Sequence, residues 1–194
     1  LKLLRSRRET VDVVPFQNVD MAPFYRSLPF TLTDAQRRCV EEAVGDMCSG
    51  KPMNRLCQGD VGSGKTMVAA ACVYFCVKNG RQAALMAPTE LLAEQHYRGL
   101  APLLEKLNIR CALLTGSTPA RTRRSVTAQL ACGEIDFAIG THALISDSVA
   151  YADLGLVVTD EQHRFGVAQR TALAEKGSHP HTLVMSATPI PRTL

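Results

Sequence analysis

Short apolar runs alternate with helical segments along most of this chain, and this alternation constrains its fold more than any other feature. Each run has the length of a β-strand and closes in small or polar residues, and the interval to the next run leaves room for a crossover helix. Such spacing is typical of a parallel sheet with helices on both faces, so we expect an α/β fold with three layers and a mainly parallel sheet. The expected strands are 53–58, 82–88, 110–116, 136–142, 154–161 and 181–188.

Helical patterns with recognisable ends lie between these runs. Thr33 followed by Gln36 fits a capping box at the start of one helix. Residues 64–79 are almost all apolar, which predicts a helix buried against the sheet. Pro119 suits the first position of a further helix, which Gly133 would end.

Residues 1–28 differ from the rest of the chain. They begin with several basic residues, continue through a strand-like segment at 10–16, and then become irregular and proline-containing. We interpret 1–28 as a connector from a preceding domain and 29–194 as one globular domain.

Composition limits the class of protein. With 46% hydrophobic and 21% charged residues the chain can bury an ordinary core, which excludes wholesale disorder. No apolar run approaches the roughly 18 residues of a membrane span. The 7 cysteines are odd in number and show no zinc spacing with histidines, so we expect buried, reduced thiols, a cytoplasmic protein and no structural metal. A net charge of +4 is compatible with an anionic partner but does not by itself indicate one.

The segment "GDVGSGKT" at 59–66 matches the phosphate-binding pattern GxxxxGK[ST] between an expected strand and an expected helix. Its glycines let backbone N–H groups converge on phosphate oxygens, and the N-terminus of the helix adds positive charge. Lys65 would reach the β- and γ-phosphates of ATP, and the Thr66 hydroxyl would bind Mg²⁺. The alternative is a glycine-rich turn without a ligand. The predicted ATP-binding residues in this P-loop are Gly59, Asp60, Val61, Gly62, Ser63, Gly64, Lys65 and Thr66.

Two adjacent acids, Asp160 and Glu161, close the apolar run 154–161. The carboxyl ends of parallel strands share one edge of a sheet, so we expect both acids near the P-loop. An ATPase needs one carboxylate for Mg²⁺ and another to orient the attacking water. Asp160 suits the first role, together with Thr66, and Glu161 suits the second. With Lys65 they form the expected catalytic set, and the alternative is a solvated pair of acids.

Several motifs follow one another in an informative order. The P-loop, "APTELLAEQH", "TGS", "GTHAL", "DEQH" and "SATPIPRTL" together resemble the first RecA-like motor domain of superfamily 2 helicases, from about Leu28 to Leu194. The resemblance implies a RecA-like P-loop NTPase fold, ATP and Mg²⁺ as cofactors, and ATP-dependent DNA helicase activity. The longer segments "DEQHRFGVAQR" and "MSATPIPRTL" resemble the corresponding segments of one group of bacterial helicases. These helicases remodel branched DNA and stalled replication forks in recombination and repair.

Two alternatives stay open beside this reading. Translocases that couple transcription to repair share "HRFGV" and "ATPIPRTL" but carry DEEH where this chain has Gln162. A P-loop ATPase unrelated to nucleic acid is the other alternative.

The resemblance gives further residues roles, each of which has a purely structural alternative. Gln36 would recognise adenine, although the capping box alone would explain it. A set of residues at strand and helix ends would contact DNA phosphates or would only cap helices: Pro88, Thr89, Glu90, Thr115, Gly116, Ser117, Thr141 and His142. The residues implied to couple ATP hydrolysis to DNA are Gln162, His163, Ser186, Ala187 and Thr188. A basic cluster would either grip a duplex or form a solvated helix face: Arg121, Arg123 and Arg124.

The same resemblance implies the partners. Branched duplex DNA would be held through its phosphate backbone, and a second RecA-like domain of the same chain would complete the ATP site. We expect that second motor domain and a wedge domain to lie outside this segment. The isolated domain should therefore have little ATPase activity, and its expected location is the bacterial cytoplasm without membrane contact.

Overall fold

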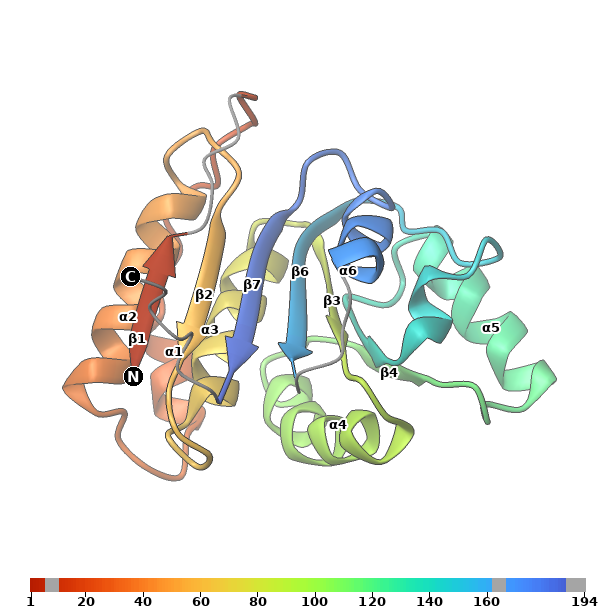
Figure 1. Cartoon of the computed structure of the whole chain (residues 1–194), viewed down its shortest axis with the longest axis horizontal. Coiled ribbons are helices and arrows are strands. Elements are labelled where there is room, and N and C mark those ends of the chain that lie inside the picture. The colour runs from red at the N-terminus through yellow and green to blue at the C-terminus, as the bar shows by residue number, and fades with distance from the viewer. Residues whose placement is uncertain (6–10, 162–166, 188–194) are drawn as a thin grey trace, which may run out of the picture.

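The computed structural model describes residues 1–5, 11–161 and 167–187. Within them a seven-stranded sheet runs in the order β1-β2-β7-β6-β3-β5-β4 (Figure 1). Its strands are β1 (Lys2–Arg5), β2 (Asn54–Gln58), β3 (Gln82–Met86), β4 (Cys111–Leu114), β5 (Phe137–Gly140), β6 (Leu154–Glu161) and β7 (His181–Ser186). Neighbouring strands are parallel, except that β1 pairs with β2 in the antiparallel sense. Each strand expected from the apolar runs is confirmed and lies within its run.

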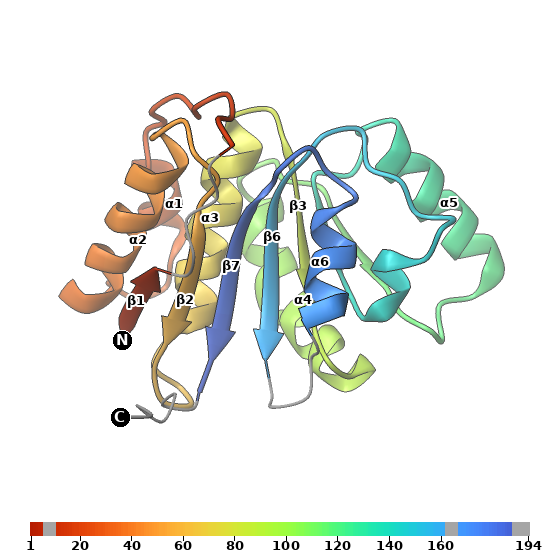
Figure 2. The same ribbon diagram turned by 45° about the horizontal axis from the view of Figure 1, so that its top comes forward.

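Helices cover both faces of the sheet, which confirms the three-layer α/β fold. They are α1 (Ala22–Ser27), α2 (Asp34–Met47), α3 (Lys65–Lys78), α4 (Glu90–Glu105), α5 (Ala120–Ala131), the 3₁₀ helix η1 (His142–Ile145) and α6 (Val167–Ala174). Figures 1 and 2 show α3 behind the sheet and α6 in front of it. Two separate hydrophobic clusters match this division: one joins the sheet to α2, α3 and α4, and the other joins it to α5, η1 and α6.

The expected helix ends are mostly observed. Thr33 is the N-cap of α2 and forms a complete capping box with Gln36. Helix α3 is buried without interruption from Val68 to Cys76, as its apolar sequence predicts. Pro119 differs by one position, because it is the N-cap of α5 rather than its first helical residue. Gly133 follows α5 with a positive φ of 79°, as expected for a helix stop.

The N-terminal segment departs from expectation in its secondary structure. The strand predicted at 10–16 is wrong, because residues 11–16 are irregular and Val14 is 80% exposed. Their backbone bonds go instead to the end of α2, where the Phe16 N–H donates to the Met47 carbonyl. The strand that does form is β1, which the basic opening of the chain did not suggest.

The segment expected to be a connector packs closely on the domain. Phe16 and Phe24 are buried in the larger hydrophobic cluster, and their rings contact those of Phe75 and Tyr74 respectively. These contacts place residues of the segment 11–28 in the same core as α3. The boundary near residue 28 stays a prediction.

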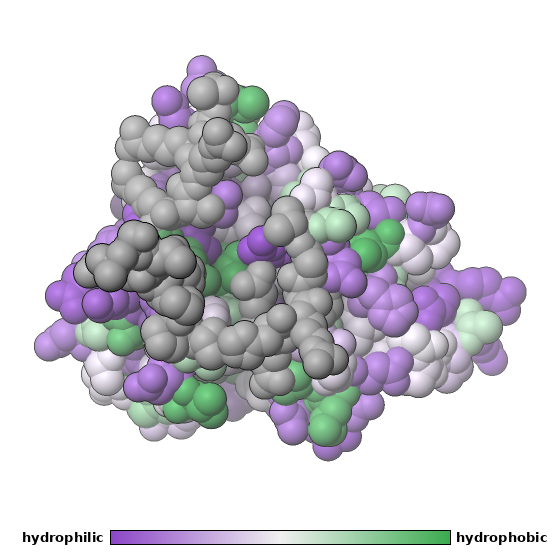
Figure 3. Space-filling view, in the orientation of Figure 1, coloured by the Kyte–Doolittle hydropathy of each residue, from purple (hydrophilic) through white to green (hydrophobic). Residues whose placement is uncertain are grey.

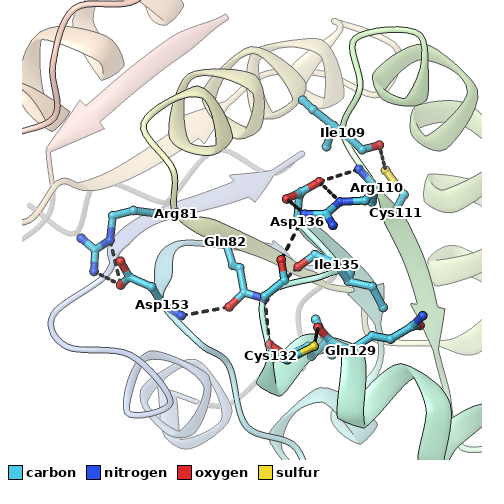
Figure 4. A network of polar contacts seen from close by, with 12 residues as sticks. Arg81, Gln82, Ile109, Arg110, Cys111, Gln129, Cys132, Ile135, Asp136 and Asp153 are labelled. Atoms are coloured by element: carbon cyan, nitrogen blue, oxygen red, sulfur yellow. Dashed lines mark hydrogen bonds and ion pairs between the residues drawn. The ribbon is translucent and has the colours of Figure 1, made fainter.

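A polar network holds the loops at the amino ends of the strands (Figure 4). Gln82 is 5% exposed, and its amide donates to the carbonyls of Leu130 and Ile135 at 2.9 and 2.7 Å. Its side-chain oxygen accepts from the Asp153 N–H at 3.0 Å. Arg110 adds a forked ion pair with Asp136 close by. The network lies at the end of the sheet opposite to the predicted site.

The visible face of the molecule mixes polar and apolar residues. On the face seen in Figure 3, apolar residues form small patches among polar ones. Among the described residues, no helix is both long and apolar enough to cross a membrane.

Candidate nucleotide and nucleic-acid site

The predicted site segments come together because six strands end at one edge of the sheet, the lower edge in Figure 1. The P-loop follows β2, and the acid pair closes β6. The segments expected to face DNA follow β3, β4 and β5. Because β2 and β6 both pair with β7, only one strand separates the P-loop from the acids.

The side chain of Lys65 folds back onto the backbone of the P-loop. Lys65 Nζ donates to the carbonyl oxygens of Gly59 and Asp60 at 2.6 and 2.8 Å. Within the described part of the chain no side chain caps α3, so N–H groups of its first turn are oriented toward this edge without a side-chain acceptor there. Ser63 Oγ is buried and has no hydrogen-bond partner among the described residues. A lysine, an uncapped helix start and an orphaned hydroxyl together form a cradle suited to phosphate.

The tip of the P-loop is open to solvent. Asp60, Val61 and Gly62 are exposed, and Val61 reaches 90% exposure. Thr66 lies in the first turn of α3 and is partly buried.

Gln36 contacts the P-loop from α2. Its Nε2 donates to the Ser63 carbonyl at 3.1 Å, and its Oε1 accepts from the Thr33 N–H at 2.9 Å. Gly64, at φ 82°, passes so close that a Cβ there would lie 2.0 Å from Gln36 Nε2. The capping interpretation of Gln36 is therefore observed, and adenine recognition stays a prediction.

Asp160 lies at the end of β6 and has an unexpected partner. His96 Nε2 of α4 lies 2.7 Å from Asp160 Oδ2, with 12% and 21% of the two side chains exposed. The sequence assigned His96 no role. Glu161 is opposite Ser186 in the β6–β7 register, and its side chain lies outside the described residues.

The end of β7 touches the P-loop through the backbone. The Gly59 N–H donates to the Ser186 carbonyl at 3.2 Å, and Ser186 itself is 8% exposed. Ala187 is partly buried beside it. The other predicted coupling residues lie outside the described residues: Gln162, His163 and Thr188.

The segments after β3 and β4 form one connected surface. Thr89 caps α4 by accepting from the Leu92 N–H at 3.2 Å. Glu90 accepts from the Ser117 N–H at 2.9 Å. Hydrogen bonds from the Ser117 hydroxyl and N–H lower the pKa of Glu90, so it stays ionised. Pro88 precedes them and is partly buried.

Arg123 holds the loop after β4 from α5. Its guanidinium donates to the carbonyls of Thr115 and Gly116 at 2.6 and 3.3 Å. Thr115 is 3% exposed, and its hydroxyl lies 3.0 Å from Ser117 Oγ inside the loop. Gly116 and Ser117 are exposed, as are the neighbouring Arg121 and Arg124. The basic cluster therefore divides into one loop-holding arginine and two exposed ones.

Thr141 and His142 differ in their access to a ligand. Thr141 is 2% exposed, and its hydroxyl has no partner among the described residues. His142, the first residue of η1, is exposed. Of this pair only the histidine side chain is open to a partner in solution.

The described residues contain no group of three or more histidine, cysteine, aspartate or glutamate side chains arranged to hold a metal ion. Cys39, Cys57, Cys72 and Cys76 are buried. Burial raises the pKa of the Cys57 thiol to about 12, so it behaves as a small apolar residue.

A mainly parallel sheet with a P-loop after one strand and an acid pair two strands away is typical of the P-loop NTPase class. Residues 33–194 match the DEAD/DEAH box helicase family, and the chain belongs to that family.

Curated relatives narrow the similarity to one kind of helicase. The chain is 55% identical to the ATP-dependent DNA helicase RecG of Bacillus subtilis over 92% of its length, and it covers 26% of that protein. It is 58% identical to RecG of Streptococcus pneumoniae over 87% of its length, covering 25% of that protein.

A solved structure shows the same similarity. RecG bound to a three-way DNA junction superposes with a TM-score of 0.82 at 48% identity, over 94% of this chain and 25% of that one. The chain thus spans about a quarter of the length of these relatives. The predicted resemblance to branched-DNA helicases of superfamily 2 is confirmed.

Proposed function

We propose that this chain is the ATP-binding motor domain of a RecG-type ATP-dependent DNA helicase. The whole protein would remodel branched DNA and stalled replication forks in recombination and repair. One observation carries the proposal: Lys65, the uncapped start of α3 and Asp160 gather at one edge of the sheet. Relatives named RecG at 55–58% identity favour it over a transcription-coupled translocase and over an ATPase unrelated to nucleic acid.

The phosphate groups of ATP fit the P-loop cradle. Lys65 would exchange its bonds to two backbone carbonyls for bonds to the β- and γ-phosphates, while Ser63 Oγ gains a partner. The remaining P-loop residues would supply backbone N–H groups, and Gln36 would recognise adenine from the edge of the loop. Thr66 and Asp160 offer the hydroxyl and carboxylate oxygens that Mg²⁺ prefers.

Glu161 completes the expected catalytic set. By its place next to Asp160 in the sequence, it would orient the attacking water. Hydrolysis of the phosphoanhydride supplies the energy for movement along DNA.

The DNA surface would be formed by the exposed residues of the strand-end loops. Thr89, Gly116, Ser117 and His142 are open to solvent and can meet phosphate oxygens. Contacts to phosphate do not distinguish one base from another, so binding would depend on the shape of the DNA rather than on its sequence.

The less accessible residues of this set suit another role. Glu90 carries a negative charge that repels phosphate, and it already accepts from Ser117, so we assign it to ordering the loop. Thr115 and Thr141 are buried and would act in the same way, while Pro88 directs the chain into α4.

The proposal also covers the coupling of ATP hydrolysis to DNA and the partners of this domain. Ser186 and Ala187 would link the P-loop to the acid pair, together with Gln162, His163 and Thr188. A second RecA-like domain of the same chain would close the ATP site against residues 29–194, with 1–28 joining a preceding domain. The bacterial cytoplasm is the proposed location.

Nucleotide binding and ATP turnover test the proposal separately. The 194-residue chain should bind MgADP and MgATP in calorimetric titrations, and Lys65→Ala should weaken MgATP binding by about 1.5–3 kcal/mol because charged hydrogen bonds are lost. Steady-state ATPase should be near background in this chain. It should rise strongly with branched DNA once the sequence is extended through the second motor domain, because arginines supplied across such a site accelerate hydrolysis by roughly 10³–10⁵.

Two outcomes would contradict the proposal. Wild-type affinity in Lys65→Ala would remove the P-loop assignment. An extended protein that hydrolyses ATP without any response to DNA would remove the helicase assignment while leaving the ATP site in place.

A further inference from the structure

The contact between His96 and Asp160 joins two elements that the predicted motifs treat separately. His96 lies on α4, whose first turn belongs to the surface proposed to face DNA. Asp160 closes β6 beside the proposed ATP site. Their side chains meet at 2.7 Å and are 12% and 21% exposed, so water competes little for this bond.

The geometry restricts how Asp160 presents its carboxylate. A protonated Nε2 of His96 donates to Oδ2, which fixes the rotation of the carboxylate. The second oxygen, Oδ1, then keeps its lone pairs for another partner. Hydrogen bonds of this kind to a metal-binding side chain commonly change metal affinity by about 10–100-fold.

We infer that His96 is a positioning residue for Asp160, holding its carboxylate in the orientation that binds the divalent cation of the nucleotide site. The inference rests on the proposed function, because it needs Asp160 to bind that cation. Helix α4 thereby connects the loop surface around Thr89 and Glu90 to the cation site through one side chain.

Metal affinity is the direct measure of this role. The 194-residue chain is saturated with ADP and titrated with Mn²⁺ in place of Mg²⁺, and free Mn²⁺ is read by electron paramagnetic resonance. His96→Ala should lower Mn²⁺ affinity about 10-fold or more, with metal-free ADP binding unchanged. His96→Gln should recover most of the affinity, because its Nε2 can donate from a similar position.

Matched variants separate positioning from packing. Arg98→Ala changes an 80% exposed side chain on the same helix and should leave Mn²⁺ affinity at the wild-type value. His96→Leu keeps the volume without the donor, so it should behave like His96→Ala and replaces that variant if it fails to fold.

Each contrary result has its own meaning. Unchanged Mn²⁺ affinity in both His96→Ala and His96→Leu would overturn the inference, and so would a gain in affinity, because His96 would then be competing with the cation. Failure of the wild-type chain to bind ADP would overturn the proposed ATP site as well.

Discussion

Gly64 is the residue of the P-loop with the least room for a side chain. At φ 82° a Cβ would be strained, and it would lie 2.0 Å from Gln36 Nε2. We therefore expect Gly64→Ala to lower the free energy of unfolding by about 1–3 kcal/mol, by adding backbone strain and displacing the Gln36 bond to Ser63. Urea unfolding measures the loss, and MgADP titration should show weaker binding.

Gly99 provides the matched control. It lies inside α4, where a Cβ would have no neighbour within 4 Å. Gly99→Ala should stabilise the chain by about 0.5–1 kcal/mol, because alanine loses less conformational freedom in a helix. Equal effects of the two substitutions would show that the Gln36 contact has no energetic weight.

Residues in contiguous motifs were predictable, and residues that act through distant partners were not. The P-loop pattern alone places Lys65 at the start of a helix. His96 gives no such signal, because its partner Asp160 is 64 residues away and only the sheet order brings them together. Glu90 and Ser117 were both expected to face DNA, but the bond between them, across 27 residues, was not predicted.

At the scale of elements, Gln82 fixes the amino ends of three strands at once. We expect Gln82→Leu to lower the free energy of unfolding by about 2–4 kcal/mol, because the Ile135 carbonyl and the Asp153 N–H lose their partner. The Leu130 carbonyl loses one of its bonds but keeps those from the backbone N–H groups of Gly133 and Ala152. Arg110→Ala should cost less than about 1 kcal/mol, because the arginine side chain is 58% exposed. Thermal and urea unfolding of both variants would compare them, and a larger loss from Arg110→Ala would contradict the burial argument.

Helices and strands were predictable from the sequence wherever their buried residues form a regular apolar pattern. The central strands β3 and β5 were predictable because their apolar runs are buried on both faces, whereas β2 and β4 alternate buried with partly buried residues. Segment 10–16 contains strand-forming valines, but Pro15 cannot donate a backbone bond and Val14 faces solvent. Strand β1 exists only because β2 offers an unpaired edge to its four residues, and no local pattern shows that.

At the scale of the whole molecule, stability should depend on pH through His181. This side chain is 1% exposed and accepts from the Met53 N–H through Nδ1. Burial lowers its pKa from 6.5 to about 4, with the charge of Arg81 adding to the effect. Between these values the unfolded chain binds a proton that the folded chain does not, so stability falls as pH drops from 6.5 toward 4. At about 1.4 kcal/mol per pH unit the loss is at most about 3.5 kcal/mol.

Urea unfolding between pH 4 and 7 would measure this dependence. His181→Asn keeps an acceptor near the Nδ1 position but does not titrate, so its stability should vary less over the same range. An identical pH profile in the two proteins would assign the dependence to other groups.

The antiparallel pairing of β1 has a practical consequence for labelling the protein. Lys2 lies opposite Gln58, and a Cβ on Gly59 would be 2.8 Å from the Leu1 side chain. Whatever is joined ahead of Leu1 therefore emerges at the rim of the P-loop. An affinity tag there would crowd the nucleotide, whereas a fluorescent dye at the same position would report its arrival and departure.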